Sequence, residues 1–484
     1  MTTVSNLRKL LHRKAWEMCA PLPVNTTAAG FVVSDRDDLN SKSPAFYVAS
    51  NTSIWRYEGE EDGWAQIPSS GIAGTFGAGA CGEFRGLGAM GGSFTQTATG
   101  GTTTTIVTNR TIVRNLTGRI VRVVAGTGIG YSGTISSNTL GANSVLTLSA
   151  PNGVAFDATT QFQIYSGSLW YFCPGAGTVG FSVYDIATNS WTSRSVTGLP
   201  TTFATDGVLV STPSGGMTAL TGTSTGSNTS TTLNNSGKAW GTNMWANYQV
   251  RITAGTGIGQ IRTIASNTGT ALTVSSAWTV TPDATSVYAI EANDDFFYLL
   301  GNNAVTMYRF SVSGNSWSTL SPGAARAGAP GTGATANFIG GVSGWNNETL
   351  VKHLEAATIY RQNGRYIYSF RAGNSNTLDV YDIAANTWIS GVAYANQQEV
   401  FTTGAANCDS DGKIYLQKEA TGRIMIFDVG ENILLGSTPN YHPQGTVILG
   451  NKMFVLPYYD GGTKLTFLYT LLHTRAELLR SLII

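Results

Sequence analysis

Short apolar and aromatic runs, each bounded by small or polar residues, recur along the chain. The clearest are FYV at 46–48, LWYF at 169–172, FFYLL at 296–300, RYIY at 365–368 and KIYL at 413–416. Runs of this length, rich in aromatic and β-branched residues, are typical of strands rather than helices. A last pair, KMFVL at 452–456 and LTFLY at 465–469, has the same character. The pattern predicts an all-β protein of many short strands.

A second pattern follows each of the five runs and usually ends in tryptophan. The stretch VYDIATNSW at 183–191 returns almost unchanged as VYDIAANTW at 380–388. An aromatic residue stands seven positions before the tryptophan, and Asp or Asn stands two positions before it, which suits a turn. The copies are Tyr57 to Trp64, Tyr184 to Trp191, Phe310 to Trp317 and Tyr381 to Trp388, with a degenerate fifth from Phe427 to Leu434. We predict that each copy is a hairpin and that these residues have structural roles.

An acid follows the aromatic residue in four of the five copies, as Glu58, Asp185, Asp382 and Asp428, and it is Asp185 and Asp382 in the two copies that match best. Because these acids repeat with the hairpin, we expect them to form turn hydrogen bonds rather than to act in catalysis. The pattern resembles kelch-type β-propeller blades, where it marks the inner hairpin. The resemblance implies about six four-stranded blades around one axis, with each tryptophan wedged between neighbouring blades.

The spacing of the tryptophans indicates two insertions. Trp64 and Trp191 lie 127 residues apart and Trp191 and Trp317 lie 126 apart, whereas Trp317 and Trp388 are separated by 71. One blade needs only about 40–50 residues. The extra material is itself duplicated, since VAGTGIG and FDATTQF in the first interval match TAGTGIG and PDATSVY in the second. Alternating residues in both copies indicate strands.

These repeats predict five segments. Residues 1–92 hold an N-terminal helix and the first blade, 93–167 and 217–291 are the inserted β-modules, 168–216 is a blade, and 292–484 hold the remaining blades and a C-terminal segment.

The modules also resemble a module that recurs in virion proteins of tailed bacteriophages, through AGTGIGQIRTI and PDATSVY. The opening LLHRKAWEMCAPLPVNTTAAGFVVSD and the later GIAGTFGAGACG look like virion structural proteins of the same kind. This resemblance implies a subunit of a phage particle.

Apolar stripes near the two ends predict short terminal helices. Leu7, Leu10 and Leu11 fall on one helical face, as do Leu479 and Ile483 near the C-terminus. Each stripe packs on its own propeller or, alternatively, docks on a neighbouring subunit.

Composition and charge narrow the classes of partner. The 484 residues are 42% hydrophobic and 12% charged, which is enough apolar material for a large core. A net charge of +1 offers no basic surplus for nucleic acid. The N-terminus lacks the uninterrupted apolar run of a signal peptide, and no segment is long and apolar enough to span a membrane. We therefore expect synthesis in the host cytoplasm.

Candidate chemistry is sparse. Cys19, Cys81, Cys173 and Cys408 form no CxxC pair, which disfavours zinc and fits a reducing folding environment, while His12, His353, His442 and His473 share no local spacing. Gly128, Gly130 and Gly133 form a literal GxGxxG, but β-branched residues follow it and Arg262 replaces its third glycine in the second module. We interpret it as a glycine turn between strands. The sequence predicts no catalytic residue, metal or cofactor.

Three classes of function follow. The leading hypothesis is a structural subunit of a tail, neck or baseplate ring, a homo-oligomer that contacts other virion proteins. The alternative is a carbohydrate-binding adhesin or capsid-surface decoration protein that binds host-surface glycan through exposed Trp170, Trp245 or Trp278. The third is an enzyme with a propeller fold, but no motif in the sequence supports it.

Overall fold

The computed structural model describes residues 17–20, 23, 31–34, 45–50, 53–58, 63–73, 80–85, 96–112, 115–165, 169–175, 177–185, 189–199, 207–211, 218–293, 295–300, 305–326, 335–338, 365–370, 377–393, 406–408, 413–418, 423–428, 433–437, 443–449, 452–457 and 466–470. Within these ranges every helix or strand is a β-strand, which confirms the all-β prediction. The predicted terminal helices, with Leu7, Leu10, Leu11, Leu479 and Ile483, lie outside the described residues.

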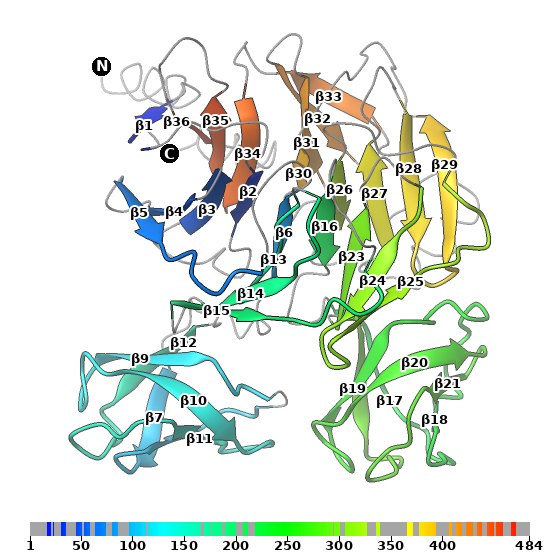
Figure 1. Cartoon of the computed structure of the whole chain (residues 1–484). Helices are drawn as coiled ribbons and strands as arrows, with labels where there is room; N and C mark the ends of the chain where they lie inside the picture. Colours follow the sequence, from blue (N-terminus) through cyan, green and yellow to red (C-terminus); the bar gives the residue numbers. More distant parts are fainter. Residues whose placement is uncertain are drawn as a thin grey trace, which may run out of the picture.

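Six antiparallel sheets of four strands stand in the upper part of Figure 1. Sheet I comprises β2 (Phe31–Ser34), β3 (Ala45–Ser50), β4 (Ser53–Glu58) and β5 (Gly63–Ile67). Sheet II comprises β6 (Cys81–Arg85), β13 (Leu169–Cys173), β14 (Ser182–Asp185) and β15 (Ser190–Ser193). Sheet III comprises β16 (Val208–Ser211), β23 (Phe296–Leu300), β24 (Tyr308–Ser311) and β25 (Ser316–Thr319).

The other three sheets are drawn from the second half of the chain and from its beginning. Sheet IV comprises β26 (Thr335–Phe338), β27 (Tyr366–Phe370), β28 (Thr377–Asp382) and β29 (Thr387–Ala393). Sheet V comprises β30 (Ala406–Cys408), β31 (Lys413–Lys418), β32 (Arg423–Asp428) and β33 (Ile433–Ser437). Sheet VI comprises β34 (Pro443–Leu449), β35 (Lys452–Pro457), β36 (Thr466–Thr470) and, beyond β36, β1 (Glu17–Cys19).

The sheets form a β-propeller-like arrangement. Their first strands contact one another in a cyclic order, from β2 to β6, β16, β26, β30 and β34 and back to β2. Sheet VI is completed by the first described strand, because Glu17 lies opposite Leu468 and Cys19 lies opposite Thr466. The beginning and the end of the described chain are thus held in one sheet.

The core lies between neighbouring sheets. On β13, Trp170 and Phe172 pack with Tyr47 of sheet I, whereas Tyr171 and Cys173 pack toward Phe297 of sheet III. The strand β23 is buried on both faces in the same way, with Phe297 and Leu299 toward sheet II and Tyr298 and Leu300 toward Ile367 of sheet IV. Successive side chains of a strand point to opposite faces, so each of these central strands contributes to two cores.

The predicted hairpins occupy the third and fourth strands of their sheets. Tyr57 lies opposite Trp64, Tyr184 opposite Trp191, Phe310 opposite Trp317, Tyr381 opposite Trp388 and Phe427 opposite Leu434. These are the strands farthest from the contacting first strands, so the expectation of an inner hairpin was wrong. The seven-residue spacing places the two residues of each pair directly opposite each other across a tight turn. In the four pairs that end in tryptophan, the two rings are tilted against each other.

Each hairpin tryptophan holds the connection that arrives from the preceding sheet. The indole nitrogens of Trp64 and Trp191 donate to the carbonyls of Ala20 and Pro68, over 2.9 and 2.8 Å. The backbone amides of Trp317 and Trp388 donate to the carbonyls of Thr197 and Ala324, both over 3.1 Å. All four acceptors follow the last strand of the preceding sheet.

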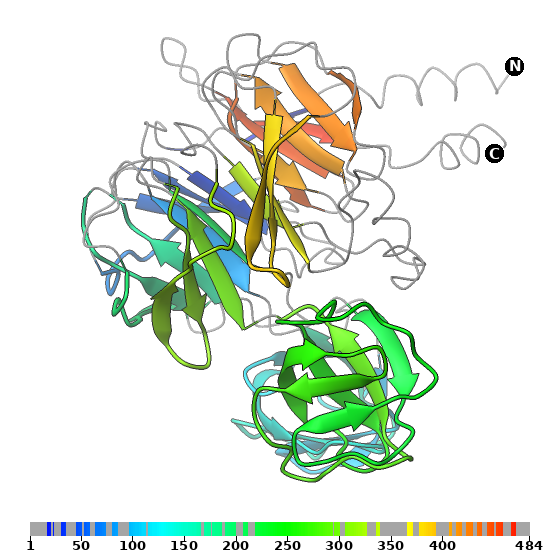
Figure 2. The ribbon, with the colours of Figure 1, turned by 90° about the vertical axis from the view of Figure 1, so that its right-hand side faces the viewer.

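The two modules lie below the sheets in Figures 1 and 2. The first is a closed barrel of β7 (Gln96–Gly101), β8 (Thr105–Thr108), β9 (Ile120–Ala125), β10 (Ser132–Asn138), β11 (Val145–Leu148) and β12 (Gln161–Tyr165). The second has the same strand order, with β17 (Thr218–Thr223), β18 (Thr232–Asn234), β19 (Gln249–Ala254), β20 (Ile261–Asn267), β21 (Ala271–Val274) and β22 (Val287–Glu291). Each has its own apolar core.

Both modules interrupt a sheet between its first and second strands. The first lies between β6 and β13 of sheet II, and the second lies between β16 and β23 of sheet III. Sheet II therefore takes its first strand from within residues 1–92, and residues 168–216 contain the first strand of sheet III. Among the described residues, no helix has the length and apolar character needed to cross a membrane.

Candidate assembly surface

The two modules leave the sheets on the same face. In an antiparallel sheet, the connections between first and second and between third and fourth strands lie at one end, and the middle connection lies at the other. Both modules replace the connection between first and second strands, and the strands that carry them, β6 and β16, are in contact. They consequently stand beside one another (Figures 1 and 2).

A glycine-rich turn joins β9 to β10 and, in the second module, β19 to β20. Gly128 and Gly130 have φ angles of 83° and 87°, and their counterparts Gly257 and Gly259 have 81° and 85°. Because φ angles in this region strain residues with a Cβ, the turn requires glycine. The motif lies between two strands in both modules, which confirms the interpretation as a turn.

An aspartate holds this turn in each module. Asp157 accepts hydrogen bonds from the hydroxyl of Thr127 (2.7 Å) and from the amide and hydroxyl of Thr159 (2.8 and 2.6 Å). Asp283 accepts the same three bonds from Thr256 and Thr285, at 2.7, 2.8 and 2.6 Å. We call each set an Asp–Thr clasp. The bonds from Thr159 and Thr285 are the main cause that lowers the pKa of the two carboxyls.

Beside each clasp, apolar side chains point into solvent. Ile129, in the glycine-rich turn, is 70% exposed, and Val154, three residues before Asp157, is 51% exposed. The matching Val280, three residues before Asp283, is 50% exposed. The Gln260 amide joins this segment to the turn by donating to the carbonyls of Gly257 (3.1 Å) and Val280 (2.7 Å). We call Ile129 with Val154, and Val280, the module tips.

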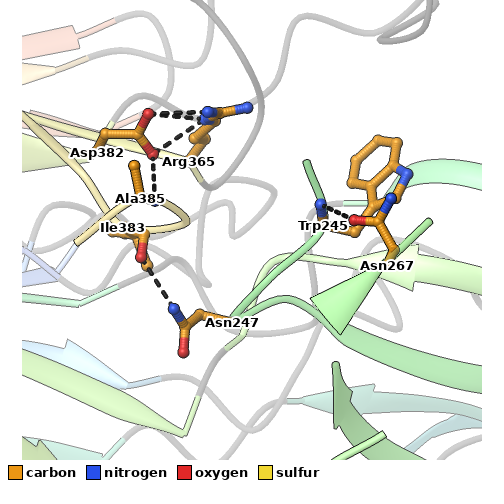
Figure 3. Close-up of polar contacts among 7 residues, drawn as sticks. All are labelled: Trp245, Asn247, Asn267, Arg365, Asp382, Ile383 and Ala385. Carbon is orange, nitrogen blue, oxygen red and sulfur yellow. Dashed lines mark hydrogen bonds and ion pairs between the residues drawn. The ribbon is translucent and has the colours of Figure 1, made fainter. Parts of the chain in front are cut away.

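The second module is anchored to sheet IV (Figure 3). The Asn247 side chain donates to the carbonyl of Ile383 over 3.0 Å, in the turn between β28 and β29. Arg365 holds this turn by donating to both Asp382 carboxylate oxygens, at 3.0 and 2.8 Å, and the amide of Ala385 donates to Asp382 over 3.1 Å. Asp382 thus stabilises a turn, as its repetition predicted.

The first module has no such anchor at the matching position, which is Gly118. Gly118 and Asn247 make the same backbone bond, to the carbonyls of Ile135 and Ile264, and both have positive φ angles, 88° and 63°. Glycine adopts this conformation freely, whereas asparagine adopts it at a cost. The asparagine side chain offsets that cost through its contact with sheet IV.

The two modules also differ in the burial of a matching arginine. In the second module, Arg251 pairs with Glu291 over 3.2 Å, and the two side chains are 4% and 2% exposed. The matching arginine of the first module, Arg122, is exposed. The two modules also meet each other, since the side chain of Leu140 lies against Gly259, where a Cβ would collide with it. The second module is therefore seated on the propeller, and the first presents more of its surface.

The three tryptophans expected to stack on sugars are buried, so that prediction was wrong. Trp170 and Trp245 are fully buried and Trp278 is 5% exposed. Trp170 packs on Tyr47 between two sheets, Trp245 packs edge-on against Tyr248 in a module core, and Trp278 is covered by the Arg262 guanidinium. A ring enclosed in this way has no free face for a sugar.

Two features escaped the sequence prediction. Cys81 and Cys173 are directly opposite each other on β6 and β13, although 92 residues separate them in the chain. In the sequence, the only sign of the Asp–Thr clasps is that both modules contain the segments AGTG and DAT. The described part of the chain contains no group of three or more His, Cys, Asp or Glu side chains that could hold a metal, and the four histidines lie outside it.

Neither a family model nor a curated protein matches the chain. Among solved structures, it is similar to selenomethionine-substituted virginiamycin B lyase from Staphylococcus aureus, with 10% identity, 94% of this chain and 100% of that chain covered, and a TM-score of 0.35. It is also similar to the RRP9 WD40 repeats, with 8% identity, 94% and 97% covered, and a TM-score of 0.36. The propeller-like arrangement of this chain follows from its own strand pairing and contacts.

Proposed function

We propose that the protein is a structural subunit of a tailed-phage virion, placed in a tail, neck or baseplate ring. It is a six-bladed, kelch-like propeller that acts through protein–protein contacts rather than catalysis. Six four-stranded sheets with cyclic contacts support the blade number, and the Tyr–Asn–Trp hairpins support the kelch-like class. The resemblance of the module sequences AGTGIGQIRTI and PDATSVY to a module of tailed-phage virion proteins supports a location in the virion.

The observation that carries the proposal is the repetition of exposed apolar side chains at matching places in two modules on one face. A single exposed valine is unremarkable on any protein surface. Here Val154 and Val280 are both half exposed, and each is held next to a clasped glycine-rich turn. Covering such side chains gains about 25 cal/mol for each Å² of apolar surface removed from water. We propose that neighbouring copies in a symmetric ring, or other virion proteins, cover them.

A paired substitution tests the tips. Val154→Asp with Val280→Asp places charge on both tips and should lower the mass of the assembled protein in analytical ultracentrifugation and its incorporation into particles. The matched control is Val179→Asp with Val305→Asp, since these valines are similarly exposed, at 38% and 42%, in second-to-third-strand connections on the opposite face. Unchanged Tm values would show that both variants fold.

If the control variant loses assembly as strongly as the tip variant, the tips are not the contact surface. A wild-type chain that is monomeric and absent from purified particles would reject the virion role altogether. Imaging of intact particles carrying a labelled chain separates a tail, neck or baseplate ring from a location on the head surface.

A further inference from the structure

The first and second strands of sheet II carry two cysteines that face each other. Cys81 begins β6 and Cys173 ends β13, and the two are direct partners in the antiparallel pairing. Both are free thiols in the structure and almost completely buried, with exposures of 4% and 2%. Direct partners on antiparallel strands have Cα atoms about 4.5 to 5.5 Å apart. Disulfides form when this distance is about 4.4 to 6.8 Å.

From this geometry we infer that Cys81 and Cys173 are a disulfide-forming pair that locks β6 to β13. These are the two strands from which the first module is suspended, and the pair lies at their end farthest from it. At the matching place in sheet III, Val208 faces Leu300. The two modules are thus secured differently, the second by the bond from Asn247 to sheet IV, and the first by a covalent bond between its supporting strands.

The oxidant for this bond is a small-molecule disulfide of the glutathione class. One cysteine thiolate attacks that disulfide and releases one small thiol, and the second cysteine thiolate then displaces the other small thiol. Two cysteine thiols and one small disulfide become one protein disulfide and two small thiols. Burial and the neighbouring Cys81 thiol raise the pKa of Cys173 well above its usual range. Because the thiolate is the reacting form, the bond forms mainly while the chain folds in an oxidising environment, before the pair is enclosed, and chains folded in a reducing cytoplasm keep both thiols.

The test produces the full chain in an oxidising and in a reducing cytoplasm. A Cys19→Ser with Cys408→Ser background leaves only the pair, and a specific protease site inserted between Ala142 and Asn143, in an exposed turn of the first module, allows one cut between the two cysteines. After the cut, chains from the oxidising cytoplasm should run as one species in denaturant and separate on reduction. Their intact mass should be lower by two hydrogen atoms.

Variants of the pair provide the control. Cys81→Ser and Cys173→Ser should each give fragments that separate without reductant, and the oxidised parent should have a higher Tm than its reduced form. Fragments of the oxidised parent that separate without reductant, with both thiols alkylated, would overturn the inference. The outcome does not depend on a virion role, so it can fail or succeed independently of the proposed function.

Discussion

The asparagine two residues before the hairpin tryptophan is explained by its backbone and its side chain together. Asn189, Asn315 and Asn386 have left-handed φ angles of 52°, 45° and 48°. The Tyr184 and Tyr381 hydroxyls donate to the side-chain oxygens of Asn189 and Asn386, at 2.5 and 2.6 Å. Where phenylalanine replaces the tyrosine, at Phe310, the Asn315 oxygen instead accepts from the amide of Ser195, over 3.3 Å.

Substitutions at Asn386 separate these two contributions. Asn386→Ala should lower the free energy of unfolding by about 2 to 3 kcal/mol, since it adds left-handed strain to the lost hydrogen bonds. Asn386→Gly should cost only about 1 kcal/mol, because glycine adopts the conformation without strain. Denaturant titration of both variants measures the difference. Equal losses would mean that backbone strain has no part in the choice of residue.

The Asp–Thr clasps predict that the modules are sensitive to acid. Hydrogen bonds lower the pKa of Asp157 and Asp283 in the folded state, so the unfolded state takes up protons first as the pH falls. The stabilisation is complete above the ordinary aspartate pKa of about 4 and disappears as the pH falls through the lower, folded-state pKa. Melting curves of the wild type between about pH 5 and pH 2 should show this loss.

The Asp157→Asn with Asp283→Asn variant is the comparison for that experiment. Its Tm should be lower than that of the wild type at neutral pH and should depend less on pH in the acid range. If its acid dependence equals that of the wild type, other carboxylates control the acid stability of the modules.

At the scale of elements, local pattern predicted the hairpins and modules, because their partners are close in sequence. The spacing from Tyr184 to Trp191 and the duplicated AGTGIG are properties of single hairpins, and both kinds of hairpin are present in the structure. The pairing of β6 with β13 was not predictable in this way, since a whole barrel separates the two strands. The burial of Trp170 also escaped prediction, because alternation along β13 does not reveal that a sheet covers each face.

Asn247 provides a test of how the second module is seated. Asn247→Gly restores the residue of the first module, removes the bond to Ile383 and relieves the left-handed strain. We expect the free energy of unfolding to change by less than about 1 kcal/mol, together with faster hydrogen exchange where the module meets the β28–β29 turn. Small-angle scattering should show a wider range of module orientations.

The matched control is Asn143→Gly, which relieves a left-handed asparagine (φ 51°) in the exposed β10–β11 turn of the first module. It should leave both the scattering and the exchange at the β28–β29 turn unchanged. If Asn247→Gly behaves in the same way, the module is held by its buried face alone.

At the scale of the whole molecule, the two modules make different contributions to one face of the propeller. The second is held on sheet IV by Asn247 and encloses its Arg251–Glu291 pair, and the first stands beside it with the matching Arg122 exposed. Both modules project from one face of the propeller because both interrupt the same connection of neighbouring sheets, and each carries a half-exposed valine, Val154 or Val280. A rigid support that presents two similar contacts side by side suits the repeated, symmetric contacts of a ring of subunits.

The placement of β1 beside β36 has a consequence for biosynthesis. Among the described strands, β1 leaves the ribosome first and has no partner until β36 has emerged, so sheet VI is the last of the six sheets to be completed. Until then the nascent chain must keep an unsatisfied strand edge from joining other chains. A premature stop just before β36 would leave β1 without its partner strand and β35 without one of its neighbours, and such a product should aggregate rather than accumulate as a smaller folded form.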